Sequence, residues 1–172
     1  MMKKQDIKDK SVLFADLDGT LIKTASGKTF PINTADFVIR QDVLSVLQKL
    51  TNLRHLFIVT NQGGIESGFY TTEQIRLKLD AITNLLYANL PNCHVGWMFC
   101  PTNNKTDDNR KPNVGMLTTL SRSAKLTNKF TMFMIGDASG KPGQFSDSDK
   151  KTADNFGIDY IDIEDFVKLF EE

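Results

Sequence analysis

The sequence lacks the features that are typical of disulfide-rich, secreted and membrane-spanning proteins. Only two of its 172 residues are cysteine, Cys93 and Cys100, which is too few for a disulfide framework. No secretory signal peptide opens the sequence, so we expect a reducing compartment, cytoplasmic or nuclear, and not a secreted protein. No apolar run approaches the length of a transmembrane helix, so no membrane association is expected.

An excess of charge of one sign is also missing. The 21 basic and 21 acidic side chains balance, so no overall field attracts nucleic acid or a membrane surface. There is no internal repeat and no low-complexity segment. The length and a hydrophobic content of 40% predict a single domain with a substantial core. We place this domain at residues 11–172, behind a polar lead-in at residues 1–10. The oligomeric state is not indicated.

Five short apolar runs, rich in β-branched and aromatic residues, predict buried strands of a parallel sheet. They lie at 11–15, 55–60, 95–100, 131–136 and 158–161. Apolar stripes with helical spacing lie between or after them, at 43–50, 75–86, 114–125 and 163–170. Thr71 and Gln74 form a capping-box pattern before the second stripe. This alternation predicts an α/β fold with a doubly wound, Rossmann-like, mostly parallel sheet.

Polar residues follow three of the predicted strands. Asp16 and Asp18 come after the first strand, Thr60 and Asn61 end the second, and Asp137 follows the fourth. In sheets of this kind the active crevice lies beyond the carboxyl ends of the strands. We therefore expect these side chains to meet at one rim of the sheet.

The three aspartates indicate a cation site. Side chains alternate along a strand, so Asp16 and Asp18 can point the same way, and Asp137 brings a third acid to the same rim. Crowded carboxylates without a nearby histidine favour Mg²⁺, which prefers carboxylate, water and phosphate oxygens. One aspartate can then attack phosphorus, while the second protonates the leaving oxygen and later deprotonates water.

Four motifs, taken together, carry a family resemblance. DLDGT at 16–20 is followed by VTNQ at 59–62, RKP at 110–112 and GDA at 136–138, with DSD at 147–149. The sequence thus resembles the haloacid dehalogenase-like phosphatases. The resemblance implies that Asp16 is the nucleophile, that Asp18 is the acid/base and that Thr60 binds the phosphoryl group. It also implies that Lys111 stabilises the charge on nucleophile and phosphate, with Asn61 at the phosphate site.

The same resemblance implies a metal site, made by Asp16, Asp18, Asp137 and Asp149. An insertion separates Asp149 from Asp137, so Asp147 is an alternative to Asp149. The pair Asp147-Ser148 is also able to cap the helix that follows.

Three further segments narrow the resemblance. They are LIKTASGKTFP at 21–31, NRKPNVGML at 109–117, and GDASGK with FSDSDKKTADNFGI within 136–158. They resemble the 3′-phosphatase domain of polynucleotide kinase/phosphatase, over about residues 13–166. This implies removal of terminal 3′-phosphates from DNA or RNA ends through an aspartyl-phosphate, with nucleic acid 3′-phosphate ends as the partner.

The predicted site is open. Between Asp18 and the helix near Val43 there is room for a short flap but not for a folded cap domain, so the end of a polymer can enter. Lys28, Arg110 and Lys141 are candidate substrate-binding cations. The aromatic residues Phe30, Phe69 and Tyr70 serve either to pack the loops or to stack bases.

Two absent patterns set the remaining alternatives. Gly27-Lys28-Thr29 resembles the end of a P-loop, but Ile22 stands where the first glycine of a P-loop belongs. A kinase half is therefore not expected. A separate kinase or ligase chain is a candidate partner. The segment 101–112 lacks the cysteines and histidines of a zinc site, which counts against a heptose-phosphate phosphatase. Two alternatives stay open: a small-molecule (sugar or histidinol-type) phosphatase of the same superfamily, and a non-catalytic subunit that binds nucleic-acid ends.

Overall fold

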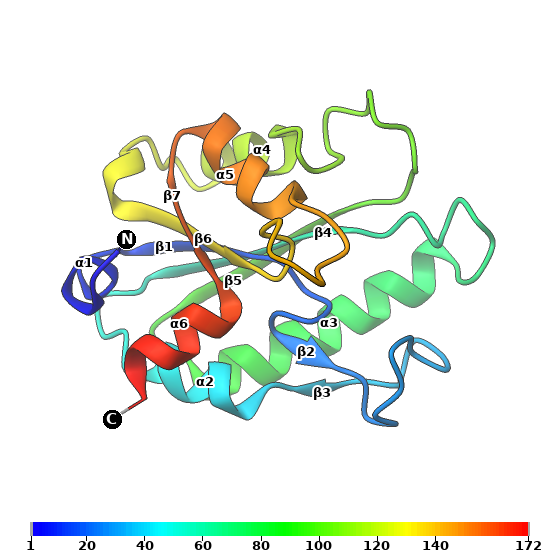
Figure 1. Cartoon of the computed structure of the whole chain (residues 1–172), viewed down its shortest axis with the longest axis horizontal. Coiled ribbons are helices and arrows are strands. Elements are labelled where there is room, and N and C mark those ends of the chain that lie inside the picture. The colour runs from blue at the N-terminus through cyan, green and yellow to red at the C-terminus, as the bar shows by residue number, and fades with distance from the viewer. Residues whose placement is uncertain (1, 172) are drawn as a thin grey trace.

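The computed structural model describes residues 2–171 and is built on a five-stranded parallel sheet (Figure 1). The strand order is β5-β4-β1-β6-β7. The strands are β1 (Val12–Ala15), β4 (His55–Asn61), β5 (His94–Cys100), β6 (Met132–Gly136) and β7 (Asp159–Asp162). The predicted strands are confirmed with boundaries that shift by a residue. A 3₁₀ turn, Lys129–Thr131, occupies the predicted start of β6.

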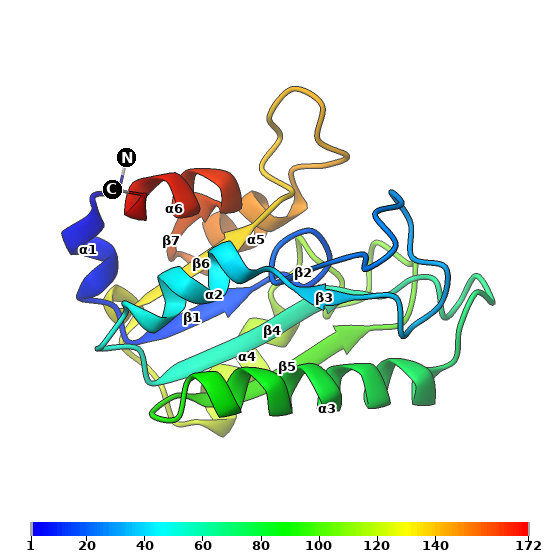
Figure 2. The ribbon, with the colours of Figure 1, turned by 90° about the horizontal axis from the view of Figure 1, so that it is seen from below.

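Helices cover both faces of the sheet (Figure 2). Alternate residues of β1 point to opposite faces, so Leu13 and Ala15 belong to one buried cluster and Val12 and Phe14 to another. The first cluster includes residues of α2 (Gln41–Gln48), α3 (Thr72–Asn89) and α6 (Ile163–Phe170). The second includes residues of α4 (Gly115–Ser123) and α5 (Ser148–Phe156). The doubly wound fold is thereby confirmed.

Local sequence signals fix the ends of two helices that border the site. Thr71 caps α3 as predicted, since its side chain accepts a hydrogen bond from Gln74 N and its amide donates one to the Gln74 side chain. Asp147 occupies the N-cap position of α5 without a side-chain capping bond, and it pairs with Lys151 instead. Gly157 ends α5 in the left-handed region, with φ of 82°.

Residues 2–10 are more structured than a polar lead-in. Lys4–Lys8 form a short helix, α1, and Ile7 is fully buried in the same cluster as Leu13. One apolar residue in a polar segment gives no periodic signal, which is why the sequence did not predict this helix.

The connection after β1 is a short flap, as predicted. It consists of β2 (Ile22–Lys23) and β3 (Val38–Ile39), which pair antiparallel, and of the loop between them. Asp36 ties this loop together by accepting hydrogen bonds from Ser26 and from the amide of Ile32. No folded cap covers the rim anywhere in residues 2–171. In the same residues, no helix has the length and hydrophobicity that a membrane crossing requires.

Candidate active site

The strand order brings the predicted polar residues together. Because β1 lies between β4 and β6, Asp16, Thr60 and Asp137 come from the ends of three neighbouring strands. Asp16 follows β1 directly, and its amide still donates to Ile135 O of β6. The predicted convergence at one rim is confirmed.

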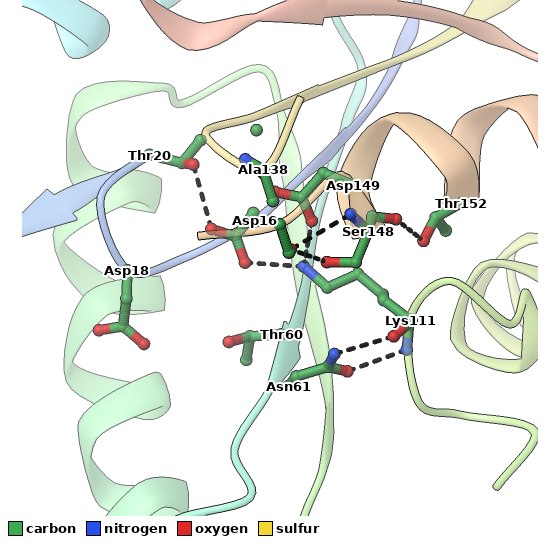
Figure 3. A network of polar contacts seen from close by, with 12 residues as sticks. Asp16, Asp18, Thr20, Thr60, Asn61, Lys111, Ala138, Ser148, Asp149 and Thr152 are labelled. Carbon is green, nitrogen blue, oxygen red and sulfur yellow. Dashed lines mark hydrogen bonds and ion pairs between the residues drawn. The ribbon is translucent and has the colours of Figure 1, made fainter. Parts of the chain in front are cut away.

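Three carboxylates form the centre of the site, and two of them, Asp16 and Asp149, are labelled in Figure 3. Asp16, Asp137 and Asp149 each offer an oxygen, and these oxygens lie within 4.8 Å of one another. Asp149 stands in the first turn of α5 and accepts a hydrogen bond from Ala138 N at 3.1 Å. Between the two alternatives left by the sequence, the structure brings Asp149 to this group, whereas Asp147 lies at the surface with Lys151.

Two glycines allow the carboxylates to come this close. A Cβ atom added at Gly19 would overlap the carboxylate of Asp137, and one added at Gly136 would overlap that of Asp149. Gly19 also has φ of 81°, a conformation that costs side-chain-bearing residues free energy. The backbone at both positions therefore leaves no room for any other residue.

Lys111 forms ion pairs with two of the three carboxylates. Its side chain is only 3% exposed, and Nζ lies 2.7 Å from Asp16 Oδ1 and 2.6 Å from Asp149 Oδ1. The side chain of Asn61 fixes the backbone of this lysine twice, because Oδ1 accepts from Lys111 N at 2.9 Å and Nδ2 donates to Lys111 O at 3.1 Å. The side chain of Asn61 therefore holds Lys111 in place, and its predicted role at the phosphate site stays a prediction.

The electrostatics favour a cation at this centre. Burial raises the pKa of Asp16, and burial together with the Asp16 and Asp149 carboxylates raises the pKa of Asp137 to about 7. Burial alone would lower the pKa of Lys111, but Asp149 and Asp16 outweigh it and hold this pKa above its usual value. Three acids thus face one base, and their hard oxygen donors fit Mg²⁺. Asp16, Asp137 and Asp149 are the residues that would hold it.

Asp18 does not join the other three acids through its side chain. The strand ends at Ala15 and the chain turns at Gly19, so the expected alternation does not continue to Asp18. Its carboxylate is 54% exposed and contacts Gln62 and Lys78, on the side of α3 (Figure 3). The predicted metal-ligand role of Asp18 therefore has no support from its side-chain position.

Thr60 lies between the group of three carboxylates and the side chain of Asp18. It is buried, and its hydroxyl accepts a hydrogen bond from Gln62 Nε2 at 2.9 Å. The same nitrogen donates to Asp18 Oδ2, also at 2.9 Å. Thr60, the predicted phosphoryl-binding hydroxyl, is thus linked to Asp18 through a single amide group.

The three predicted substrate cations have different environments. Lys141 forms ion pairs with Asp165 at 2.6 Å and Asp162 at 3.3 Å, so its charge is already neutralised. Arg110 donates to Thr102 O at 2.7 Å. Lys28 is exposed on the flap, and among residues 2–171 no ion pair engages its ammonium group. Lys28 keeps the freest charge of the three for a substrate phosphate.

Sequence reasoning overlooked Gln62 and Lys78. Gln62 was part of the VTNQ motif but received no role. Lys78 has a recognisable signal, because it stands on the helical stripe formed by Ile75, Leu79 and Ile82. A lysine on a buried stripe requires a partner, which is a reason to search for an acid opposite it.

A scan against protein-family models matches residues 11–167 to the family described as polynucleotide kinase 3 phosphatase. The chain belongs to this family. The matched segment contains every residue of the carboxylate group, together with Lys111 and Thr60. It thereby identifies the chain as a phosphatase of the haloacid dehalogenase type.

Relatives of this chain include cellular and viral proteins. The chain is 35% identical over 167 residues to the bifunctional polynucleotide phosphatase/kinase of Schizosaccharomyces pombe. The match covers 92% of this chain but only 38% of that protein. The chain is 31% identical over 164 residues to an uncharacterized 20.8 kDa protein of Autographa californica nuclear polyhedrosis virus, with 90% and 84% coverage.

Solved structures confirm the fold. The D,D-heptose 1,7-bisphosphate phosphatase of B. bronchiseptica, complexed with magnesium and phosphate, superposes with a TM-score of 0.67. It is 19% identical and the match covers 87% of this chain and 78% of that one. A phosphatase from Mesorhizobium loti gives a TM-score of 0.64 at 20% identity, with coverage of 87% and 69%.

Proposed function

We propose that the chain is a Mg²⁺-dependent polynucleotide 3′-phosphatase that removes terminal 3′-phosphates from DNA or RNA ends. The observation that carries this proposal is the buried contact of Asp16 with Lys111, beside Asp137 and Asp149, in a chain of the polynucleotide kinase 3 phosphatase family. The S. pombe relative, named a polynucleotide phosphatase/kinase, supports the substrate class. A separate kinase or ligase chain is a further proposed partner.

The openness of the site supports a polymer as substrate. The flap contributes only a hairpin, with two residues in each strand, and a loop, and the segments that directly follow β4 and β5, at 62–71 and 101–114, are loops. Phe30 and Phe69 are exposed on the flap and on the loop after β4, and Lys28 lies near Phe30 in sequence. Exposed aromatic side chains and a cation are the groups that bind single-stranded nucleic acid.

In this proposal Asp16 attacks phosphorus and the bond to the 3′-oxygen breaks. The leaving oxygen takes a proton from Asp18 and becomes the 3′-hydroxyl, while phosphorus stays on Asp16 as an aspartyl-phosphate. Water then attacks phosphorus and gives a proton to Asp18, and the Asp16 carboxylate is released with inorganic phosphate. Lys111 stabilises the charge on Asp16 and on the phosphoryl oxygens. Bound Mg²⁺ would neutralise the carboxylates and polarise the phosphoryl group.

A small-molecule phosphatase is the second candidate. The chain is 28% identical over 138 residues to a probable D-glycero-D-manno-heptose-1,7-bisphosphate 7-phosphatase of Thermoplasma volcanium, and the match covers 90% of that protein. A sugar phosphate uses the same aspartate chemistry, so the substrate alone separates the two candidates.

The deciding experiment measures phosphate release with Mg²⁺ from matched oligonucleotides that carry a 3′- or a 5′-phosphate, beside a panel of sugar phosphates. We expect selective loss of the 3′-phosphate. Asp16→Asn, which keeps the side-chain volume, serves as the contamination control and should be inactive. Faster turnover of a sugar phosphate would contradict the polynucleotide assignment, and binding of 3′-phosphate ends without release would indicate a non-catalytic subunit.

A further inference from the structure

We propose that Lys78, together with Gln62, positions the carboxylate of Asp18 for the proton transfers of the phosphatase reaction. This inference rests on the proposed acid/base role of Asp18. Lys78 does not touch the carboxylate group around Asp16, so it acts through Asp18 and is a positioning residue.

The burial of Lys78 is the first observation. Its side chain is 5% exposed on the inner face of α3, on the same stripe as Ile75 and Leu79. Lysine is almost never buried to this extent unless its charge is paired. Its Nζ lies 3.5 Å from Asp18 Oδ1 and 5.7 Å from the centre of the Phe37 ring in the flap. The helix therefore presents an ammonium group to Asp18 at a cost in hydration.

Gln62 holds the other oxygen of the same carboxylate. Its Nε2 donates to Asp18 Oδ2 at 2.9 Å and to Thr60 Oγ1 at 2.9 Å. Tyr70 donates from its hydroxyl to Gln62 Oε1 at 2.8 Å, and this bond fixes which end of the amide faces Asp18. Each oxygen of Asp18 is thus contacted by a different segment of the chain.

The contacts with Lys78 and Gln62 fix the position of the Asp18 carboxylate, which the backbone alone does not fix. Asp18 lies outside the sheet, more than half of its side chain is exposed, and within residues 2–171 no other hydrogen bond or ion pair holds its carboxylate. A general acid accelerates a reaction only when it is held within hydrogen-bond reach of the leaving oxygen. Gln62 sets this position relative to Thr60, and Lys78 holds the carboxylate on the α3 side. Asp16 and Asp18 are therefore each fixed by a lysine of their own.

The test compares two substrates that differ in their need for an acid. A 3′-phosphate oligonucleotide has a basic leaving oxygen, whereas p-nitrophenyl phosphate has one that needs little protonation. The value of kcat/KM reports only the steps up to formation of the aspartyl-phosphate. We expect Lys78→Met to lower kcat/KM on the oligonucleotide about tenfold or more, as part of the roughly 10²–10⁴-fold that a positioned acid contributes. On the aryl phosphate the loss should stay below about threefold, within the same framework.

Two controls separate positioning from folding. Arg76→Met removes a cation from the same helix, where it stacks on Trp97 and Phe99, and should leave both values unchanged. The melting temperature of Lys78→Met should stay close to that of Arg76→Met, because the partner left behind, Asp18, has a side chain that is 54% exposed and stays hydrated. Lys78→Gln is measured in parallel, so that one neutral variant remains if the other fails to fold.

The last arm repeats Lys78→Met in an Asp18→Asn background, with the oligonucleotide as substrate, because only a basic leaving oxygen gives a single-variant loss large enough to test additivity. If Lys78 acts through Asp18, the second change has no further effect. Equal losses on both substrates, additive losses in the double variant, or no loss at all would each overturn the proposal. If the wild-type protein does not hydrolyse the oligonucleotides, glycerol phosphate replaces them as the substrate with a basic leaving oxygen. A wrong substrate assignment is thereby distinguished from a wrong role for Lys78.

Discussion

Removing the ammonium group of Lys111 should destabilise the metal-free protein strongly. Lys111→Met keeps the length of the side chain but leaves the carboxylates of Asp16 and Asp149 without their ion pairs at 2.7 and 2.6 Å. The Asp149 side chain is 1% exposed, so water cannot replace the lysine. Breaking a buried ion pair by removing one partner costs about 3–5 kcal/mol. For a chain of this size that cost lowers the melting temperature by about 6–20 °C.

Urea and thermal unfolding in EDTA measure this loss. The matched control is Lys150→Met, because the Lys150–Asp154 pair is exposed on both sides and should change the free energy of unfolding by at most about 0.5 kcal/mol. Addition of Mg²⁺ should recover part of the stability of Lys111→Met, since a cation that binds only the folded state stabilises it. A loss below about 1 kcal/mol in EDTA would refute the argument that Lys111 neutralises two buried acids.

Two further predictions follow from the same site. The pKa of Asp137 is raised from 3.8 to about 7, so between these pH values the folded state binds a proton that the unfolded state does not. The free energy of unfolding in EDTA should therefore fall as pH rises through 7. Urea midpoints at pH 5 and pH 8 measure this, Mg²⁺ should remove the difference, and equal midpoints in EDTA would contradict it. Asn61→Ala frees the backbone of Lys111 and should lower kcat by about tenfold or more, as displacement of a positioned catalytic group does. Asn155→Ala, which removes an exposed bond to the residue after Lys111, should leave kcat unchanged.

The sheet and its rim were predictable because they depend on short-range patterns. Continuous apolar runs specify buried parallel strands whatever their order, and polar residues at the ends of such strands meet at one edge. The sequence pattern alone therefore assigns Asp16, Thr60 and Asp137 to the same site. The strand order adds the reason that they lie so close, since β1 runs between β4 and β6.

The side-chain partners were not predictable because they depend on where the chain leaves regular structure. The strand pattern assigned Asp16 and Asp18 to one direction, but β1 ends at Ala15. The family resemblance assigned Asn61 to the phosphate site, and no local pattern indicated that the loop that carries Lys111 returns against its side chain. The choice of Asp149 over Asp147 depends on the rotation of α5, which the sequence does not specify.

The divergence of Asp16 and Asp18 gives each acid the environment that its proposed role requires. A nucleophile must be ionised. Burial raises the pKa of Asp16, so its ionisation depends on the ion pair with Lys111 and on the hydrogen bond that it accepts from Thr20 Oγ1 at 3.1 Å. A general acid/base must exchange protons with water, and Asp18 is largely exposed while two side chains hold it. Different environments for two nearby carboxylates are a general means of separating acid from nucleophile. The motif places both acids two residues apart, and the turn at Gly19, which tolerates no side chain beside Asp137, is what separates their surroundings.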